Sequence, residues 1–284
     1  MSQGLNKTKR RIKSVQSTRK ITKAMQLIAT AKVKKLLKLH DEYIYYSDEY
    51  RNLMGILSMY LPKESHYSKE NAGDLPTLYI IVTSDLGLCG AYNSSVLKYA
   101  HTLITDKDYI CPLGSKAIHH FNKDNYGDRI VAYDSLSLNL DMDKIIDVSK
   151  RIKDEFNEPK WKKIMIIYTH YVNSITSEPA VAQILPIPKE IGSWGNKDSI
   201  NIPPKFDENP KELMHNLMLP YMSSVIYSKL LESQLAEQSS RRTAMDNAND
   251  NADELLDKLT IEYNKARQSA ITQEITEVVG GAEN

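Results

Sequence analysis

The chain has 284 residues, of which 41% are apolar and 26% charged, a composition typical of a protein with a buried core. No apolar run reaches the roughly 18–20 residues that span a bilayer, and two cysteines are too few for a disulfide framework, so we expect no transmembrane segment and a reducing compartment. The net charge of +1 conceals an asymmetry, because residues 1–40 hold twelve Lys or Arg and no Asp or Glu, leaving 25 basic and 36 acidic residues in the rest.

The distribution of prolines predicts two long helices at the ends of the chain. All eleven prolines lie between Pro62 and Pro220, and no glycine follows Pro220 until Gly280. Proline removes a backbone donor and clashes with the preceding turn, so segments without it can each form one unbroken helix. We therefore predict three parts: an N-terminal coiled-coil helix (1–60), an α/β globular domain (75–200), and a C-terminal coiled-coil helix (208–284).

Apolar residues at steps of three and four predict the faces on which the two terminal helices pair. The N-terminal stripe comprises Leu36, Leu39, Tyr43, Tyr46, Tyr50, Leu53 and Leu57, with Ile21, Met25 and Ile28 upstream after an eleven-residue stutter. The C-terminal stripe comprises Ala252, Leu256, Leu259, Tyr263, Ala266 and Ala270. Neither helix can bury its stripe alone, so we expect an antiparallel two-helix coiled coil. At 1.5 Å per residue the first helix would be roughly 80 Å long and project from the middle domain.

The basic N-terminal segment has several possible functions. It can be a solvated helix face, a nucleic-acid-binding arm or a surface for an acidic partner. An Arg-rich segment without acids also resembles an organellar transit peptide, but the continuing helical periodicity argues against that interpretation.

The middle of the chain predicts an α/β domain with a Rossmann-like, mostly parallel sheet covered on both faces. We expect strands at Leu78–Val82, Tyr109–Leu113, Ile130–Tyr133 and Ile164–Tyr168, and an edge strand at Val181–Leu185 bracketed by Pro179 and Pro186. Helices are expected at Ser95–Ile104, Ser115–Phe121 and around Ile145–Phe156. The segment Gly192–Pro210 reads as a linker.

The sequence offers no catalytic constellation. The turn from Ser84 to Ala91 has neither the three-glycine dinucleotide spacing nor the Gly-Lys-Ser/Thr ending of a triphosphate loop, which favours a structural turn. Cys89 lacks a convincing His partner for nucleophilic catalysis, and His119 and His120 would point apart on a helix. We predict no catalytic residue, no cofactor site and no metal site.

Four motifs in order carry a resemblance to a known family. They are Ile21-Thr22-Lys23-Ala24-Met25, Asp85-Leu86-Gly87-Leu88-Cys89-Gly90, Gly114-Ser115-Lys116, and the segment from Tyr263 to Glu277. Together they resemble the gamma subunit of rotary F-type ATP synthases, from one end of the chain to the other.

The resemblance implies a non-catalytic rotor axle inside a ring of three alpha and three beta subunits. The α/β domain would contact the epsilon subunit and a membrane c-ring, at the cytoplasmic face of a bacterial membrane. Nucleotide turnover would occur on beta, and rotation of the axle would couple it to ion flow. Acidic lever segments of beta would then attract the basic segment of this chain, and no nucleic acid would be involved.

The resemblance also implies which residues contact the alpha/beta ring. For Met25, packing between the two helices is an equal alternative. The implied contact residues are Lys23, Met25, Lys32, Arg241, Gln268, Thr272 and Glu274.

Three departures from the family pattern leave alternatives open. Leu86 stands where the family usually has Arg, Ala91 where it has Gly, and the segment Phe206–Pro210 replaces its Tyr-Glu-Pro-x-Pro stretch. The first alternative is therefore the axle of an F1-like ATPase coupled to something other than a proton ring. A basic coiled-coil nucleic-acid adaptor is the second.

Overall fold

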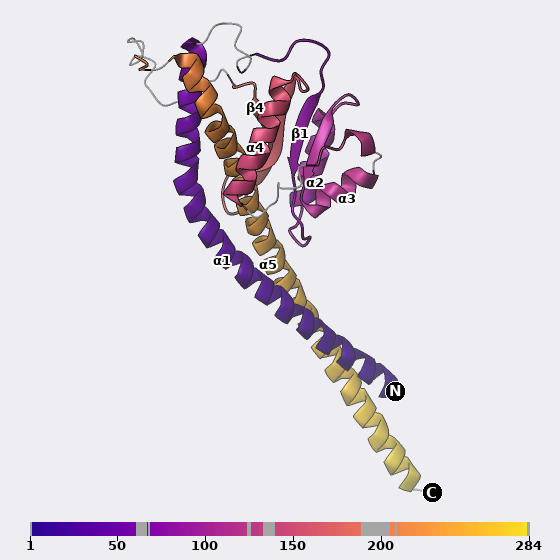
Figure 1. The fold of residues 1–284 in the computed structure, drawn as a ribbon. Coiled ribbons are helices and arrows are strands. Elements are labelled where there is room, and N and C mark those ends of the chain that lie inside the picture. Colours follow the sequence, from indigo (N-terminus) through magenta and orange to yellow (C-terminus); the bar gives the residue numbers. More distant parts are fainter. Residues whose placement is uncertain are drawn as a thin grey trace. The chain divides into compact units, whose positions relative to one another are not determined.

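The computed structural model describes residues 2–60, 67, 69–123, 126–132, 140–188, 205–207 and 209–282. The chain begins with one long helix, α1 (Ser2–Tyr60), and ends with another, α5 (Pro210–Ala282), as Figure 1 shows. Packing divides the chain into two compact units. We call Met1–Ala31 with Arg241–Asn284 the terminal pair, and Lys32–Ser240 the sheet unit.

In the terminal pair the two helices run antiparallel. Arg19 contacts Asp253, and Gln26 contacts Asp246, so the partner number on α5 falls as the number on α1 rises. By the same register Leu5 lies near the level of Ala266, so that the last residues of α5 extend past the start of α1. The predicted antiparallel helix pair is thus confirmed.

The buried face of α1 in the terminal pair differs from the predicted stripe. Ile21 and Ile28 are 61% and 58% exposed, whereas Ala29 is fully buried. The less exposed positions follow an unbroken heptad frame, so the predicted eleven-residue stutter is wrong. The frame was missed because polar or small residues, Thr8, Thr22, Gln26 and Ala29, interrupt its apolar members. Leu5, Ile12 and Val15 belong to the same frame, and all seven residues are buried or half-buried.

On α5 the predicted stripe is mostly where it was expected. Leu259 is buried, and Ala252, Leu256, Tyr263 and Ala270 are half-buried. Ala266, however, is exposed, so its assignment to the helix contact is a correction.

The sheet unit contains four strands in the order β2-β1-β3-β4. The central strand β1 (Thr77–Val82) pairs parallel with β2 (Tyr109–Leu113) and with β3 (Lys163–Tyr171), while β4 (Ser177–Leu185) pairs antiparallel with β3 at the edge. The mostly parallel sheet is confirmed. The strand predicted from Ile130 is wrong, since Ile130 makes a single parallel bridge to Ile110, and Tyr133 lies outside the described residues.

Helices cover both faces of the sheet. On one face α2 (Tyr92–Leu103) and α3 (Ser115–Lys123) bury Val96, Ala100, Ala117 and Phe121 against the strands. The other face packs against α4 (Met142–Asn157) and against the segments of α1 and α5 that belong to this unit. A short 3-10 helix, η2 (Gly127–Arg129), precedes Ile130.

The sheet unit has its own contact between α1 and α5. Leu36 is buried in a cluster with Leu231 and Leu235, to which Leu39 and Tyr43 add half-buried surface, and the Tyr43 and Tyr227 rings lie 4.3 Å apart. Tyr50 is also half-buried, and Leu57 is fully buried. Tyr46 and Leu53 are 47% and 39% exposed, so their assignment to the buried stripe is a correction. The heptad frame places Ser47 and Met54 inside instead, and both are buried.

Candidate partner-contact surface

The structure gathers most of the residues implied as partner contacts on the terminal pair. Met25 is half-buried beside the helix contact, and Arg241 is only 7% exposed. Lys32 is the first residue of the sheet unit, and the side chain of Glu274 lies outside the described residues. The exposed members of the set are Lys23, Lys32, Gln268 and Thr272.

The burial of Arg241 changes the role that it can have. A side chain with so little exposed surface contributes little direct contact to a partner. Its surroundings are its own chain, so we treat it as a residue that shapes the helix pair.

A row of polar side chains follows the exposed face of α5 near its end. It forms a shallow hollow lined by Lys265, Gln268, Ser269, Thr272, Gln273 and Thr276. The Thr272 hydroxyl donates to the Gln268 carbonyl at 2.9 Å, and the Thr276 hydroxyl to the Thr272 carbonyl at 2.8 Å. Because these hydroxyl protons are used within the helix, the hydroxyl oxygens are left as acceptors. The row therefore suits a partner that supplies N–H donors.

Basic side chains crowd the first half of α1, and this half itself carries no acidic residue. Eight lysines and arginines lie between residues 7 and 23, and all are exposed. Among the described residues, only Arg19 of these eight forms an ion pair, with Asp253. A mostly unpaired positive surface of this kind attracts acidic partners.

Large apolar side chains are exposed on both helices of the terminal pair. The most exposed member on α5 is Ile261, at 69%. Apolar groups that a protein leaves uncovered commonly mark a surface that a partner covers. The set comprises Ile21, Leu27, Ile28, Ile261, Ile271 and Ile275.

Polar groups lie inside the helix contact of the terminal pair. The Thr22 hydroxyl donates to the Asn249 side-chain oxygen, and the Asn249 amide donates to the Gln26 side-chain oxygen at 3.1 Å. Asn249 is only 6% exposed. Buried polar partners of this kind fix the register of paired helices, because a shifted register would leave them unsatisfied.

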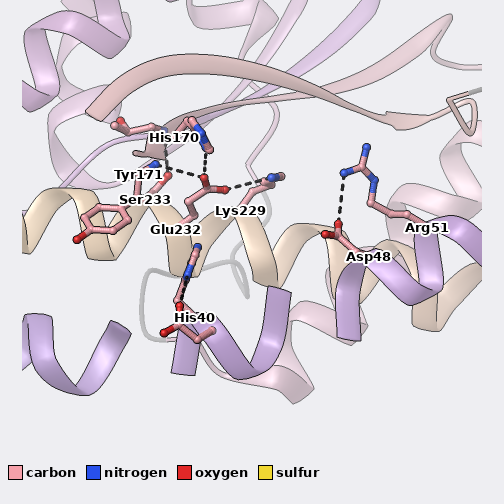
Figure 2. Close-up of polar contacts among 10 residues, drawn as sticks. His40, Asp48, Arg51, His170, Tyr171, Lys229, Glu232 and Ser233 are labelled. Atoms are coloured by element: carbon pink, nitrogen blue, oxygen red, sulfur yellow. Dashed lines mark hydrogen bonds and ion pairs between the residues drawn. The ribbon is translucent and has the colours of Figure 1, made fainter. Parts of the chain in front are cut away.

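In the sheet unit a buried carboxylate joins β3 to α5, as Figure 2 shows. Glu232 is 1% exposed and accepts hydrogen bonds from the His170 ring, from the Tyr171 backbone N–H at 3.2 Å and from Lys229 Nζ at 3.1 Å. The neighbouring Ser233 hydroxyl accepts from the Thr169 N–H at 3.2 Å. Sequence reasoning missed this cluster, because its members are some sixty residues apart and follow no local pattern.

The turn after β1 is held by hydrogen bonds within the chain. The Asp85 carboxylate accepts from the Ser115 N–H at 2.9 Å and from its hydroxyl at 3.0 Å, which joins two of the motifs that carry the resemblance. The Asn93 side-chain oxygen accepts from the Ser84 N–H at 3.0 Å. Cys89 is buried beside Tyr92, whose pKa is raised by burial and by the nearby Glu237. These contacts support the prediction of a structural turn.

Gly114 lies between β2 and α3, and this position requires glycine. Its φ is +86°, and an added Cβ would lie 2.2 Å from the Thr83 carbonyl oxygen. The Thr83 hydroxyl meanwhile donates to the Leu113 carbonyl.

Within the described residues, no group of three or more His, Cys, Asp or Glu side chains is placed to hold a metal ion.

The chain matches the family model described as ATP synthase over residues 4–284. The ATP synthase gamma chain of Mycoplasma mobile is 39% identical, with 98% of each chain covered, and that of Mycoplasma capricolum is 36% identical, with 99% of this chain and 98% of that one covered. The chain belongs to the ATP synthase gamma chain family.

Chains in solved ATP synthase structures share the fold. A chain of the Euglena gracilis mitochondrial ATP synthase (OSCP/F1/c-ring) matches with a TM-score of 0.66 and 16% identity, covering 99% of this chain and 94% of that one. A chain of the Tetrahymena thermophila central stalk and c-ring matches with a TM-score of 0.56 and 20% identity, covering 80% and 99%. Among the described residues of this chain, no helix is both long enough and apolar enough to cross a membrane.

The departure at Phe206–Pro210 has a structural role where it is described. Phe206 packs against the main core of the sheet unit. The Asn209 side chain accepts from the Lys211 N–H at 3.0 Å, and its carbonyl from the Leu213 N–H at 3.0 Å, so that Asn209 caps the start of α5.

Proposed function

We propose that this chain is the central rotor shaft of an F-type ATP synthase or ATPase, which couples ion-driven rotation to nucleotide turnover. The observation that carries the proposal is the match to gamma chains over nearly the full length of both sequences. An antiparallel pair of long helices is the element that such a shaft requires.

Catalysis is assigned to beta subunits, with this chain acting on them mechanically. The turn at residues 84–91 supports this division, because the Ser84 N–H donates to the Asn93 side-chain oxygen and the Ser115 N–H donates to the Asp85 carboxylate, so that neither N–H is left for a phosphate. The shaft would contact each beta state differently and so bias the nucleotide affinity of each site.

The proposed contact with the alpha/beta ring consists of two parts. The basic face of α1, with Lys23 and Lys32, would face acidic lever segments of beta. The polar row of α5, with Gln268 and Thr272, would accept hydrogen bonds from the ring, and Glu274 would add a further contact. Met25 would add apolar contact at the edge of the helix pair. The exposed isoleucines support the proposal, since a surrounding ring would remove them from water.

The sheet unit would contact an epsilon subunit and a membrane c-ring at the cytoplasmic face of a bacterial membrane. A second candidate is the axle of an F1-like ATPase coupled to something other than a proton ring. The Phe206–Pro210 segment favours it, because this sequence departs from the family where the foot of the shaft is expected.

Reconstitution tests the proposal. The full chain is combined with alpha and beta subunits of the same organism, and ATP hydrolysis is measured with and without it. We expect the chain to join the complex in one copy and to raise steady-state hydrolysis. Failure to assemble, or hydrolysis by the isolated chain, would contradict the proposal. Purification from native membranes through a tag on this chain distinguishes the two candidates, because only the first retains a membrane c-ring.

A further inference from the structure

Two histidines from different helices meet on the α2/α3 face of the sheet unit. The Nε2 atoms of His101 and His120 lie 2.8 Å apart, and the ring planes are inclined at 66°. His101 is exposed and His120 is half-buried, so that water reaches the pair. The rotor function proposed above makes no use of this arrangement.

The buried core positions both rings. Phe121 is fully buried, and its ring centroid lies 5.7 Å from that of His101 and 5.2 Å from that of His120. Ala100 and Ala117, which are also fully buried, hold the two helices against the sheet. The imidazoles therefore approach each other on a rigid support, which lowers the entropic cost of a ligand that joins them.

We propose that His101 and His120 together bind one divalent transition-metal ion, with water completing its coordination. Imidazole suits Cu²⁺, Ni²⁺ and Zn²⁺. Two nitrogens at about 2.0–2.1 Å from a metal and at right angles are about 2.9 Å apart, close to the separation found here. This spacing fits the square-planar or octahedral preference of Cu²⁺ and Ni²⁺ better than a tetrahedral site, where the nitrogens would be about 3.4 Å apart.

Metal binding would replace the hydrogen bond between the rings. In that bond one Nε2–H donates to the other Nε2, so one ring carries its proton on Nε2. Both Nε2 lone pairs must face the ion, so this proton moves to the Nδ1 atom of the same ring through solvent. Each imidazole stays neutral and no net proton is released. The rings turn slightly about their Cβ–Cγ bonds, from facing each other to facing a common point.

His119 supplies a matched control. It is exposed on α3 beside His120, but adjacent residues on a helix project about 100° apart, so it does not share the same ion. If metal binding depended only on having histidines at the surface, replacing His119 or His120 would weaken it equally.

The test is calorimetric titration of the untagged full chain with Ni²⁺ at pH 7.5, for the wild type and for His101→Asn, His120→Asn and His119→Asn. We expect one Ni²⁺ per chain in the wild type and in His119→Asn, and at least tenfold weaker binding in the other two variants. Circular dichroism checks that each variant folds. Equal affinity in all four proteins, or no Ni²⁺ binding by the wild type, would overturn the proposal.

A spectroscopic measurement on the wild type makes the test independent of the variants. One equivalent of Cu²⁺ should give an electron paramagnetic resonance spectrum with coupling to two imidazole nitrogens. A spectrum with one nitrogen or none would count against the paired site.

Discussion

Glu232 illustrates how single residues hold the sheet unit together. Its carboxylate is buried and receives donors from both β3 and α5, so it acts between elements that no local sequence pattern joins. A buried charge is tolerated only when hydrogen bonds compensate for lost hydration. The cluster in Figure 2 provides three such bonds. Asp48 and Arg51 in the same view form an exposed pair at 3.7 Å, for which no comparable contribution is expected.

Replacing Glu232 by Gln should lower the free energy of unfolding by about 1.5–3 kcal/mol, since hydrogen bonds to a charged group are lost at a buried position. Urea unfolding of the full chain, followed by circular dichroism, measures the change. Asp48→Asn is the matched control and should stay within about 0.5 kcal/mol of the wild type. Equal effects of the two substitutions would contradict a structural role for Glu232.

Tyr221 gives the sheet unit a dependence on alkaline pH. Burial raises the pKa of Tyr221 to about 12, from an ordinary value of 10.0. The unfolded chain therefore loses this proton first, and the stability contribution is fully present below pH 10 and is lost as pH rises through 12. Between pH 10 and 12 the free energy of unfolding of the wild type should fall relative to that of Tyr221→Phe. The expected slope is up to about 1.4 kcal/mol per pH unit. A difference that stays constant over this range would contradict the buried neutral phenol.

At the scale of the elements, the two terminal helices pair through heptad positions that hold both apolar and polar side chains. Apolar positions alternate with Thr22, Gln26 and Asn249, which bond across the pair. Such polar layers are less stabilising than leucines but penalise a shifted register. A shaft that transmits torque needs its two helices to stay in one register relative to each other. The hydrogen bonds between them supply that restraint.

The frame makes a prediction that contrasts two alanines. Ala29→Trp would insert a large ring at a fully buried position and should lower stability by about 1–3 kcal/mol through overpacking. Ala266→Trp should have little effect on the isolated chain, because Ala266 is exposed. Thermal unfolding of both variants measures the difference. A larger loss of stability in Ala266→Trp than in Ala29→Trp would contradict this assignment and place Ala266 in the helix contact, as the sequence predicted.

At the scale of the whole molecule, the charge distribution and the family match point to one role. The basic residues gather in the first forty positions, while the remainder carries an excess of acids. The match to gamma chains covers nearly the full length of this chain and of its relatives. Opposed charges steer association and exclude wrong partners more than they add affinity.

The proposed contact with acidic levers of beta predicts the effect of charge reversal in the assembled complex. Lys23→Glu combined with Lys32→Glu should reduce assembly or ATP hydrolysis, because like charges would then meet. A single neutral substitution should do little, since an exposed ion pair contributes about 0–1 kcal/mol. Lys98→Glu with Lys150→Glu, exposed lysines on α2 and α4, is the matched control. Normal assembly and hydrolysis in the first double variant would argue against the contact.

Local patterns in the sequence determined the main elements of this protein. The absence of proline from both ends predicted α1 and most of α5, and apolar runs predicted β1, β2, β3 and the edge strand. These elements depend on backbone chemistry and short-range periodicity, which a sequence displays directly. The implied contacts on the alpha/beta ring stay predictions, since no partner chain tests them.

The tertiary structure decided which side chains meet. Pairing with α5 buried Ala29 and Ser47 and left Ile28 and Leu53 exposed, because burial on a helix depends on where its partner lies. Glu232 and the pair of His101 and His120 arise in the same way, from residues whose separation along the chain hides their contact. Hydrogen bonds and metal coordination act over about 3 Å, and only the folded chain brings such groups within that distance.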